Sequence, residues 1–128
     1  MILSPPAKHI QEDLLKYKSF LSSFIYRGQS FADILALICQ RYHLSPAFFY
    51  LTLERDFQLL SRKSALKTTQ LEHLFSEYFN TKDVSVALDI IGQTYQYLLT
   101  HHPENPPSEI LKKYFLRRPA FLRQDSFE

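Results

Sequence analysis

The sequence predicts an all-α protein, a compact bundle of five to six helices in a single domain. Three observations support this fold class. Apolar residues recur at three- and four-residue spacing, residues that cap helix N-termini precede several of these runs, and no useful stretch alternates apolar and polar residues as a strand does. The 128 residues suit one core. Because the chain has only two glycines, Gly28 and Gly92, neither hairpin turns nor glycine-rich nucleotide loops are expected.

The first two helices are predicted from apolar spacing and from one cap. The first spans about Ala7 to Tyr26 and stops before Gly28; its apolar residues at helical spacing are Ile10, Leu14, Tyr17, Leu21, Phe24 and Ile25. The second spans about Phe31 to Tyr42, and Ser30 with Asp33 at its start resembles a capping box in which Asp replaces Glu. Since this second helix is apolar on nearly every face, we expect it in the middle of the bundle.

The third and fourth helices each begin with a capping signal. Ser45-Pro46 is the clearest start, because serine caps well and proline is favoured at the first helical position. This third helix is expected from Pro46 to about Leu60. Thr69 and Glu72 form a possible capping box for the fourth helix, whose apolar residues are Leu71, Leu74, Phe75, Tyr78 and Phe79.

The fifth helix is expected to begin after Asp83 and to run from Val84 to about Leu99. The proline-rich segment 102–107 must then break it, because proline removes a backbone donor and restricts the residue before it. A short final helix is expected from about Pro107 to Arg117. The prediction is therefore five main helices and one short one.

The residue types that carry most enzyme chemistry lack the necessary spacing or surroundings. Cys39 lies in the most apolar stretch of the chain, whereas a nucleophilic thiolate needs a partly exposed, electropositive setting. The sequence contains no Gly-x-Ser-x-Gly nucleophile elbow, and Glu54 and Asp56, two residues apart, do not share a helix face. No two histidines have the four-residue spacing of metal ligands on one helix; they are His9, His43, His73, His101 and His102. We therefore expect no enzyme, no cofactor and no metal site. An enzyme that used Cys39 or the two adjacent histidines would place them in a pocket.

Residues 34–57 resemble a DNA-binding helix-turn-helix in their spacing. However, the turn has His43 where glycine is common, and the second helix begins with Phe48, Phe49 and Tyr50. A helix that reads base edges should present polar or basic side chains near its N-terminus. The plainer interpretation is two packed core helices joined by a tight turn.

Positive charge is concentrated after the proline-rich segment. Residues 1–106 carry ten basic and ten acidic side chains, whereas residues 107–123 carry five basic side chains against one acidic. We therefore divide the chain into a helical bundle, 1–106, and a short basic-aromatic C-terminal helix and tail, 107–128, packed on the same domain. Such a segment suits nucleic acid, an anionic membrane surface, or an acidic protein groove with apolar pockets. In the structural alternative, its apolar side chains dock on the bundle while lysine and arginine face water.

The aromatic excess without catalytic spacing predicts a small helical protein-protein interaction module, an adaptor, inhibitor or regulatory subunit that acts by surface recognition. Its partner is expected to be another protein or a second copy in a homodimer, because Tyr, Phe and Arg are enriched in interface cores. The predicted partner-binding residues are Phe48, Phe49, Tyr50, Lys112, Lys113, Tyr114, Phe115, Arg117, Arg118, Phe121 and Arg123. The alternative is a nucleic-acid-binding regulator that uses residues 34–57 and the basic C-terminal segment. A steep loss of affinity with added salt would identify it.

The cellular compartment is predicted from three features that the sequence lacks: a cysteine pair, a signal peptide and a transmembrane stretch. A single cysteine forms no intramolecular disulfide, which is typical of a reducing compartment. The first residues contain neither a basic region nor an apolar run of signal-peptide length, and no stretch approaches the roughly 20 apolar residues of a transmembrane helix. We expect a soluble cytoplasmic protein; export by a C-terminal or unconventional signal stays open.

Overall fold

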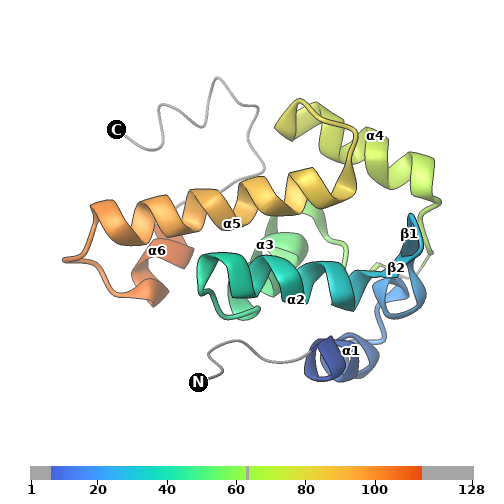
Figure 1. Cartoon of the computed structure of the whole chain (residues 1–128), viewed down its shortest axis with the longest axis horizontal. Coiled ribbons are helices and arrows are strands. Elements are labelled where there is room, and N and C mark those ends of the chain that lie inside the picture. Colours follow the sequence, from blue (N-terminus) through green and yellow to red (C-terminus); the bar gives the residue numbers. More distant parts are fainter. Residues whose placement is uncertain (1–6, 63, 114–128) are drawn as a thin grey trace.

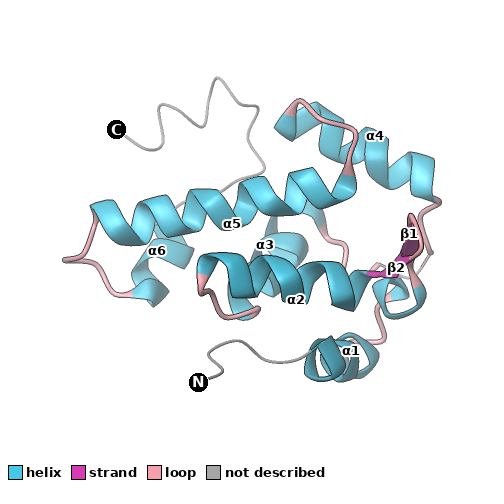
Figure 2. Cartoon of the chain, in the orientation of Figure 1, coloured by secondary structure: helices cyan, strands magenta, loops and turns pink. Residues whose placement is uncertain are grey.

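The computed structural model describes residues 7–62 and 64–113 and confirms an all-α bundle in a single domain (Figures 1 and 2). Six α-helices, one 3-10 turn and one two-stranded hairpin follow one another along the described chain. In order they are α1 (Ala7–Lys16), η1 (Phe20–Ser23), β1 (Ile25–Tyr26), β2 (Gln29–Ser30), α2 (Phe31–Tyr42), α3 (Ala47–Phe57), α4 (Thr68–Phe79), α5 (Val84–His101) and α6 (Pro107–Lys113).

The longest helix, α5, organises the bundle. It packs against α2, α3, α4 and α6, and α2 in turn packs against α1 (Figure 1). In that view α5 and α2 run side by side across the molecule, with α4 at one end of α5 and α6 at the other. Because α6 contacts α5 and its Ile110 is buried, the described start of the C-terminal region belongs to the same body as the bundle.

Aromatic contacts join α3 to its neighbours in one apolar core. The ring of Phe57 in α3 meets three rings of α4, those of Phe75, Tyr78 and Phe79, at centroid distances of 5.4, 5.6 and 5.8 Å. Phe48 lies 5.1 Å from Tyr95 of α5, measured between ring centroids. These separations are typical of favourable aromatic pairs, so α3 is held on two sides.

Two of the predicted helix caps are confirmed in detail. The Ser30 hydroxyl accepts a hydrogen bond from the backbone N–H of Asp33 at 3.1 Å, and α2 has the predicted bounds. The Asp83 carboxylate accepts from the backbone N–H groups of Ser85 and Val86 at 2.9 and 3.3 Å. Both side chains satisfy donors that the first helical turn leaves without intrahelical partners.

The N-terminal region corrects two predictions. The first helix ends at Lys16 rather than near Tyr26, because Lys18 has a left-handed φ of 56° and the chain continues as η1. A hairpin follows, although none was expected. Arg27 and Gly28 have φ of 52° and 83°, the two positive values that a type I′ hairpin turn requires. One glycine is enough for such a turn, so the low glycine count was no reason to expect a chain without hairpins.

The bounds of α3 and α5 also differ from the predictions. Ser45 does accept a hydrogen bond from the N–H of Ala47 at 3.2 Å, but α3 ends at Phe57 because Gln58 takes a left-handed φ of 55°. Helix α5 continues two residues past Leu99, to His101. Left-handed residues of this kind commonly end helices.

The N-cap of α4 is Lys67, two residues before the predicted Thr69. Its first residue is Thr68, and the side-chain oxygen of Gln70 accepts from the backbone N–H of Lys67 at 2.8 Å. Glu72, expected in a capping box with Thr69, instead accepts a hydrogen bond from the hydroxyl of Tyr26 at 2.7 Å. The Glu72 carboxylate, which we expected to cap α4, therefore holds the hairpin against α4 instead.

None of the helices within 7–62 and 64–113 is long and apolar enough to cross a bilayer.

Candidate partner-binding groove

Helix α3 is more enclosed than its sequence suggested. Seven of its eleven residues are buried: Phe48, Phe49, Tyr50, Thr52, Leu53, Asp56 and Phe57. By contrast α2, which we expected in the middle, leaves Leu37 half exposed. Within α3 only Ala47 and Leu51 are classed as exposed, and they lie one turn apart on the same face. This narrow outer face is the part of α3 that a partner could reach.

The three aromatics predicted to bind a partner through α3 are not an exposed patch. The exposed fractions of Phe48, Phe49 and Tyr50 are 7%, 0% and 9%. Phe48 packs on Tyr95, and Phe49 lies against the α5 backbone at Gly92. Three consecutive residues on a helix point in three directions, so they form no common exposed surface: Phe48 and Phe49 face the core, whereas Tyr50 lines the groove described next.

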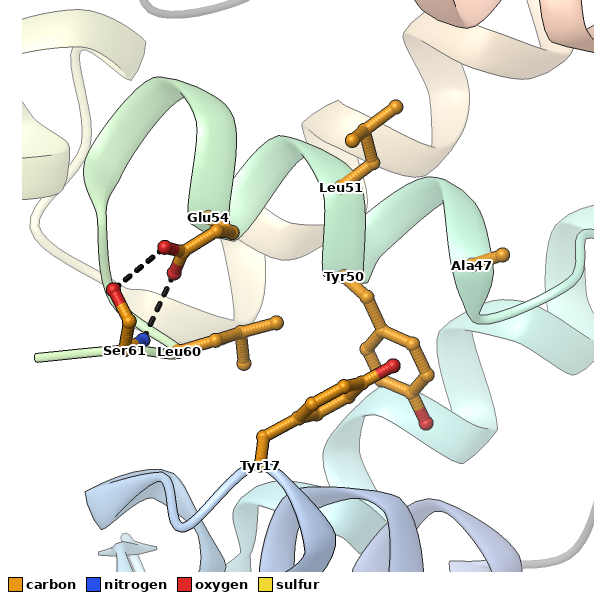
Figure 3. A pocket seen from close by; sticks show the side chains of 7 residues that line it. All are labelled: Tyr17, Ala47, Tyr50, Leu51, Glu54, Leu60 and Ser61. Atoms are coloured by element: carbon orange, nitrogen blue, oxygen red, sulfur yellow. Dashed lines mark hydrogen bonds between the residues drawn. The ribbon is translucent and has the colours of Figure 1, made fainter.

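A groove of about 470 Å³ opens on the outer face of α3 (Figure 3). It is bounded by the segment just after α1, by α3 itself and by the loop that follows α3. Its lining residues are Tyr17, Ala47, Tyr50, Leu51, Glu54, Leu60 and Ser61. Five of these seven side chains are apolar or aromatic, so the groove offers mainly carbon surface to an occupant.

Two tyrosines form one wall of the groove. The ring of Tyr17 meets the ring of Tyr50 edge to face, with centroids 5.6 Å apart and planes at 73°. The Tyr50 hydroxyl donates a hydrogen bond to the Asp13 carboxylate of α1 at 2.8 Å. Burial, and then this hydrogen bond, raise the pKa of Tyr50 well above its usual value. Tyr50 is thus a fixed, neutral wall, whereas Tyr17 remains 48% exposed.

The opposite wall is the loop after α3, and Glu54 holds it in place. One Glu54 carboxylate oxygen accepts from the Ser61 backbone N–H at 2.9 Å, and the other accepts from the Ser61 hydroxyl at 2.6 Å (Figure 3). The left-handed Gln58 turns the chain back so that this contact can form. Leu60 is carried into the wall by the same turn.

The groove can bind apolar side chains and offers one negative charge. Among its described lining residues, Glu54 alone is charged. Its carboxylate has about four lone-pair positions, of which Ser61 uses two, so a cationic group can still be accepted. The exposed apolar side chains at the rim, Tyr17 and Leu51, would lose water on binding and so favour association. The groove thus offers carbon surface and one carboxylate to an occupant.

The predicted C-terminal binding residues are described only in part. Lys112 and Lys113 lie in the last turn of α6. The remaining six predicted positions, Tyr114, Phe115, Arg117, Arg118, Phe121 and Arg123, lie outside the described residues. Their role stays a prediction.

Cys39 is enclosed in the core and is unsuited to nucleophilic chemistry. Its side chain is 0% exposed, and burial raises the pKa of the thiol to about 12. A thiol with this pKa carries almost no thiolate near neutral pH. An enzyme that used Cys39 would place it in a pocket, but Cys39 does not line the groove.

The helix-turn-helix spacing of residues 34–57 is present in the structure as α2, a short turn and α3. The turn does have a left-handed residue, His43 with φ 55°, at the position where glycine is common. The second helix, however, is α3, and Ala47 and Leu51 on its outer face carry no group that could read a base edge.

The two adjacent histidines point to different partners. A ring nitrogen of His101 lies 2.9 Å from the backbone oxygen of Tyr97, on whose ring the imidazole also stacks. His102 lies 3.7 Å from Glu104. No group of three or more potential metal ligands from His, Cys, Asp and Glu occurs in the part of the chain that the structure describes.

Sequence reasoning missed Tyr17, Leu51 and Leu60 as groove residues. Tyr17 was assigned to the apolar face of a longer first helix, and Leu60 to the end of α3. A usable signal did exist for Leu51, since it lies one turn from Ala47 on the side of the helix away from Phe49 and Leu53. Comparison of the chain with protein-family models, curated proteins and solved structures gave no match.

Proposed function

We propose that this chain is a small helical protein-protein interaction module that binds an apolar segment of another protein in the groove between Tyr17 and Leu51. The observation that supports it most directly is the groove itself, about 470 Å³ and lined mainly by carbon. An adaptor, an inhibitor or a regulatory subunit would each use such a surface.

The chemistry of the lining favours a peptide segment over a small polar ligand. Small-ligand sites are also mostly apolar, but they keep a few polar groups free to fix the orientation of a polar occupant. Here the polar groups of Glu54 and Ser61 already bond to each other. Packed tyrosine and leucine surface is instead typical of the centre of protein interfaces.

The charge of the lining defines the partner further. Glu54 would repel an acidic or phosphorylated segment and attract a lysine or arginine. We therefore expect the bound segment to carry one or two large apolar side chains with a basic side chain beside them. The same reasoning disfavours nucleic acid in this groove, since a phosphate would meet a carboxylate.

Selection from a random peptide library displayed on phage, with the full chain as bait, tests the proposal. The matched variants are Leu51→Glu, which puts a second carboxylate in the groove, and Leu37→Glu, which makes the same change at an exposed leucine of α2 outside it. We expect enriched peptides with aromatic and basic residues that bind the wild-type and Leu37→Glu chains with similar affinity. Binding to Leu51→Glu should fall at least about tenfold, the effect of losing one well-packed contact worth 1.4 kcal/mol.

The result that would contradict the proposal is equally specific. Peptides that lose affinity for both variants alike, or for neither, would place recognition elsewhere on the molecule. Binding to a second copy is checked on the same variants by sedimentation, where Leu51→Glu but not Leu37→Glu should shift a dimer to monomer.

A further inference from the structure

We infer that the groove also binds the chain's own C-terminal residues 114–123, so that this segment competes with a partner. The docking itself does not depend on a partner; only its regulatory consequence rests on the proposed function. The inference starts from the chemistry of the groove and asks which part of this chain matches it.

The composition of residues 114–123 matches the groove on both of its properties. The apolar members of the segment are Tyr114, Phe115, Leu116, Phe121 and Leu122, and its basic members are Arg117, Arg118 and Arg123. It has no acidic side chain between 114 and 123. In the docked segment, the apolar side chains pack on the tyrosine and leucine walls of the groove, and an arginine pairs with the carboxylate of Glu54. The residue types expected in a partner are thus present in the chain.

The length of the segment lets its second half extend well beyond the end of α6. It follows Lys113 at the end of α6, a helix fixed to the bundle by the buried Ile110 and by its contact with α5. Phe121 lies eight residues after Lys113, and at roughly 3.3 Å per residue an extended chain of that length spans about 26 Å. A domain of this size has a radius of gyration of roughly 13 Å, so this reach is comparable with twice that radius.

Attachment to the same chain favours this occupant over a free one. A segment attached to the same chain has an effective concentration on the order of millimolar at a site it can reach. A partner must exceed this competition, so docking of the segment lowers the apparent affinity for any other occupant. Release of the segment, for example by a second partner that binds its arginines, would then open the groove.

A spin-label experiment on the full chain tests the docking directly. A nitroxide is attached at Gln124→Cys; Cys39 is fully buried and does not compete for the label, which labelling of the wild-type chain verifies. We expect the amide NMR signals of Leu51, Glu54 and Ser61 to lose more intensity than those of Leu37 and Val86, exposed residues that do not line the groove.

Substitutions distinguish docking from mere proximity. Leu51→Glu, and separately Phe115→Ser with Phe121→Ser, should restore the groove signals, whereas Leu37→Glu should leave their loss unchanged. Equal loss at groove and reference signals, or no recovery in these variants, would overturn the inference. Loss in an isotope-labelled chain without nitroxide, mixed with an unlabelled chain that carries it, would show docking between copies and overturn docking within one chain.

Peptide binding separates this inference from the proposed function. Peptides selected on the groove should bind the Phe115→Ser, Phe121→Ser chain more tightly than the wild type. Suppose that no peptide binds the Phe115→Ser, Phe121→Ser chain while the nitroxide still lowers the groove signals in the chain without these substitutions. Docking then holds and the proposed function fails. If peptides bind both chains equally, the competition is absent and the inference fails while the proposed function holds.

Discussion

The inner and outer faces of α3 carry similar residue types but have opposite surroundings. Phe49 on the inner face is 0% exposed, whereas Leu51, two positions later, is 39% exposed. The inner face is enclosed by aromatic contacts from α4 and α5, and the outer face borders the groove. An apolar side chain therefore has no fixed role: it stabilises the fold where neighbours cover it and stays in contact with water where they do not.

The largest expected effect comes from emptying the inner face. Phe49→Ala removes a fully buried ring and leaves a cavity between α3 and α5. We expect the free energy of unfolding to fall by about 3–5 kcal/mol, the usual cost of a buried Phe-to-Ala change. Urea denaturation followed by circular dichroism measures it. A loss below about 1 kcal/mol would mean that Phe49 is not the core residue described here.

Adding a methyl group at Gly92 of α5, opposite the inner face of α3, is expected to lower the free energy of unfolding less than removing the Phe49 ring. In Gly92→Ala the added Cβ would lie 2.8 Å from a ring carbon of Tyr42, 3.1 Å from a methyl of Ile38 and 3.2 Å from the Phe49 ring. The Tyr42 ring cannot move freely, because its hydroxyl donates to Asp89 at 2.7 Å. Overpacking of this kind costs about 1–3 kcal/mol, which the better helix propensity of alanine offsets only in part. Thermal denaturation should show a lower Tm, and an unchanged or higher Tm would contradict the close approach.

The cap of α5, the helix that covers the inner face, gives a smaller and pH-dependent effect. Asp83→Ala should destabilise by about 1 kcal/mol near neutral pH, since it removes the N-cap acceptor and the partner of Arg27 at 2.7 Å. Asp83→Asn keeps the cap geometry and removes the charge, and serves as the matched control.

The pH dependence follows from the direction of the Asp83 shift. Hydrogen bonding from Ser85, outweighing partial burial, lowers the pKa of Asp83 below 3.8. The unfolded chain therefore binds this proton first as pH falls, and the stabilising contribution, present above about 4, is lost as pH drops through the folded pKa. Between pH 5 and 2 the stability of Asp83→Asn should decline less than that of wild type. Parallel declines in denaturation curves would refute this assignment.

The smallest effect on stability is expected on the outer face. Leu51→Glu and Leu37→Glu both change exposed leucines, so each should alter the free energy of unfolding by no more than about 0.5 kcal/mol. Equal stability measured by urea denaturation would allow any difference in peptide binding to be assigned to the groove. A large loss in Leu51→Glu alone would instead mean that the outer face supports the fold.

Local patterns predicted most of the helical structure. The bounds of α2 and the caps at Ser30 and Asp83 were all expected, because helix periodicity and capping involve neighbours within about four residues. The predictions failed where one residue reverses the chain. Left-handed backbone at Lys18, Arg27 and Gln58 ended a helix, formed the hairpin or closed the groove wall. These are not glycines, so composition carried no signal for them.

The candidate site was much harder to predict than the fold. The aromatic run at 48–50 was visible, but its burial depended on α4 and α5, which arrive later in the chain. The groove joins Tyr17, Leu51 and Leu60 from segments whose sequence gives no sign that they meet. A contact between distant segments has no local sequence signature.

By itself the sequence determined that this protein is helical, where most of its helices begin, and that its cysteine belongs to an apolar stretch. Those properties follow from backbone hydrogen bonding and from the spacing of apolar residues along single helices. Only the tertiary structure decided which face of α3 is enclosed and which borders a groove. Burial is a property of the assembled neighbours rather than of the side chain, so the same types of residue, aromatic and leucine, form the core on one side of α3 and border the groove on the other.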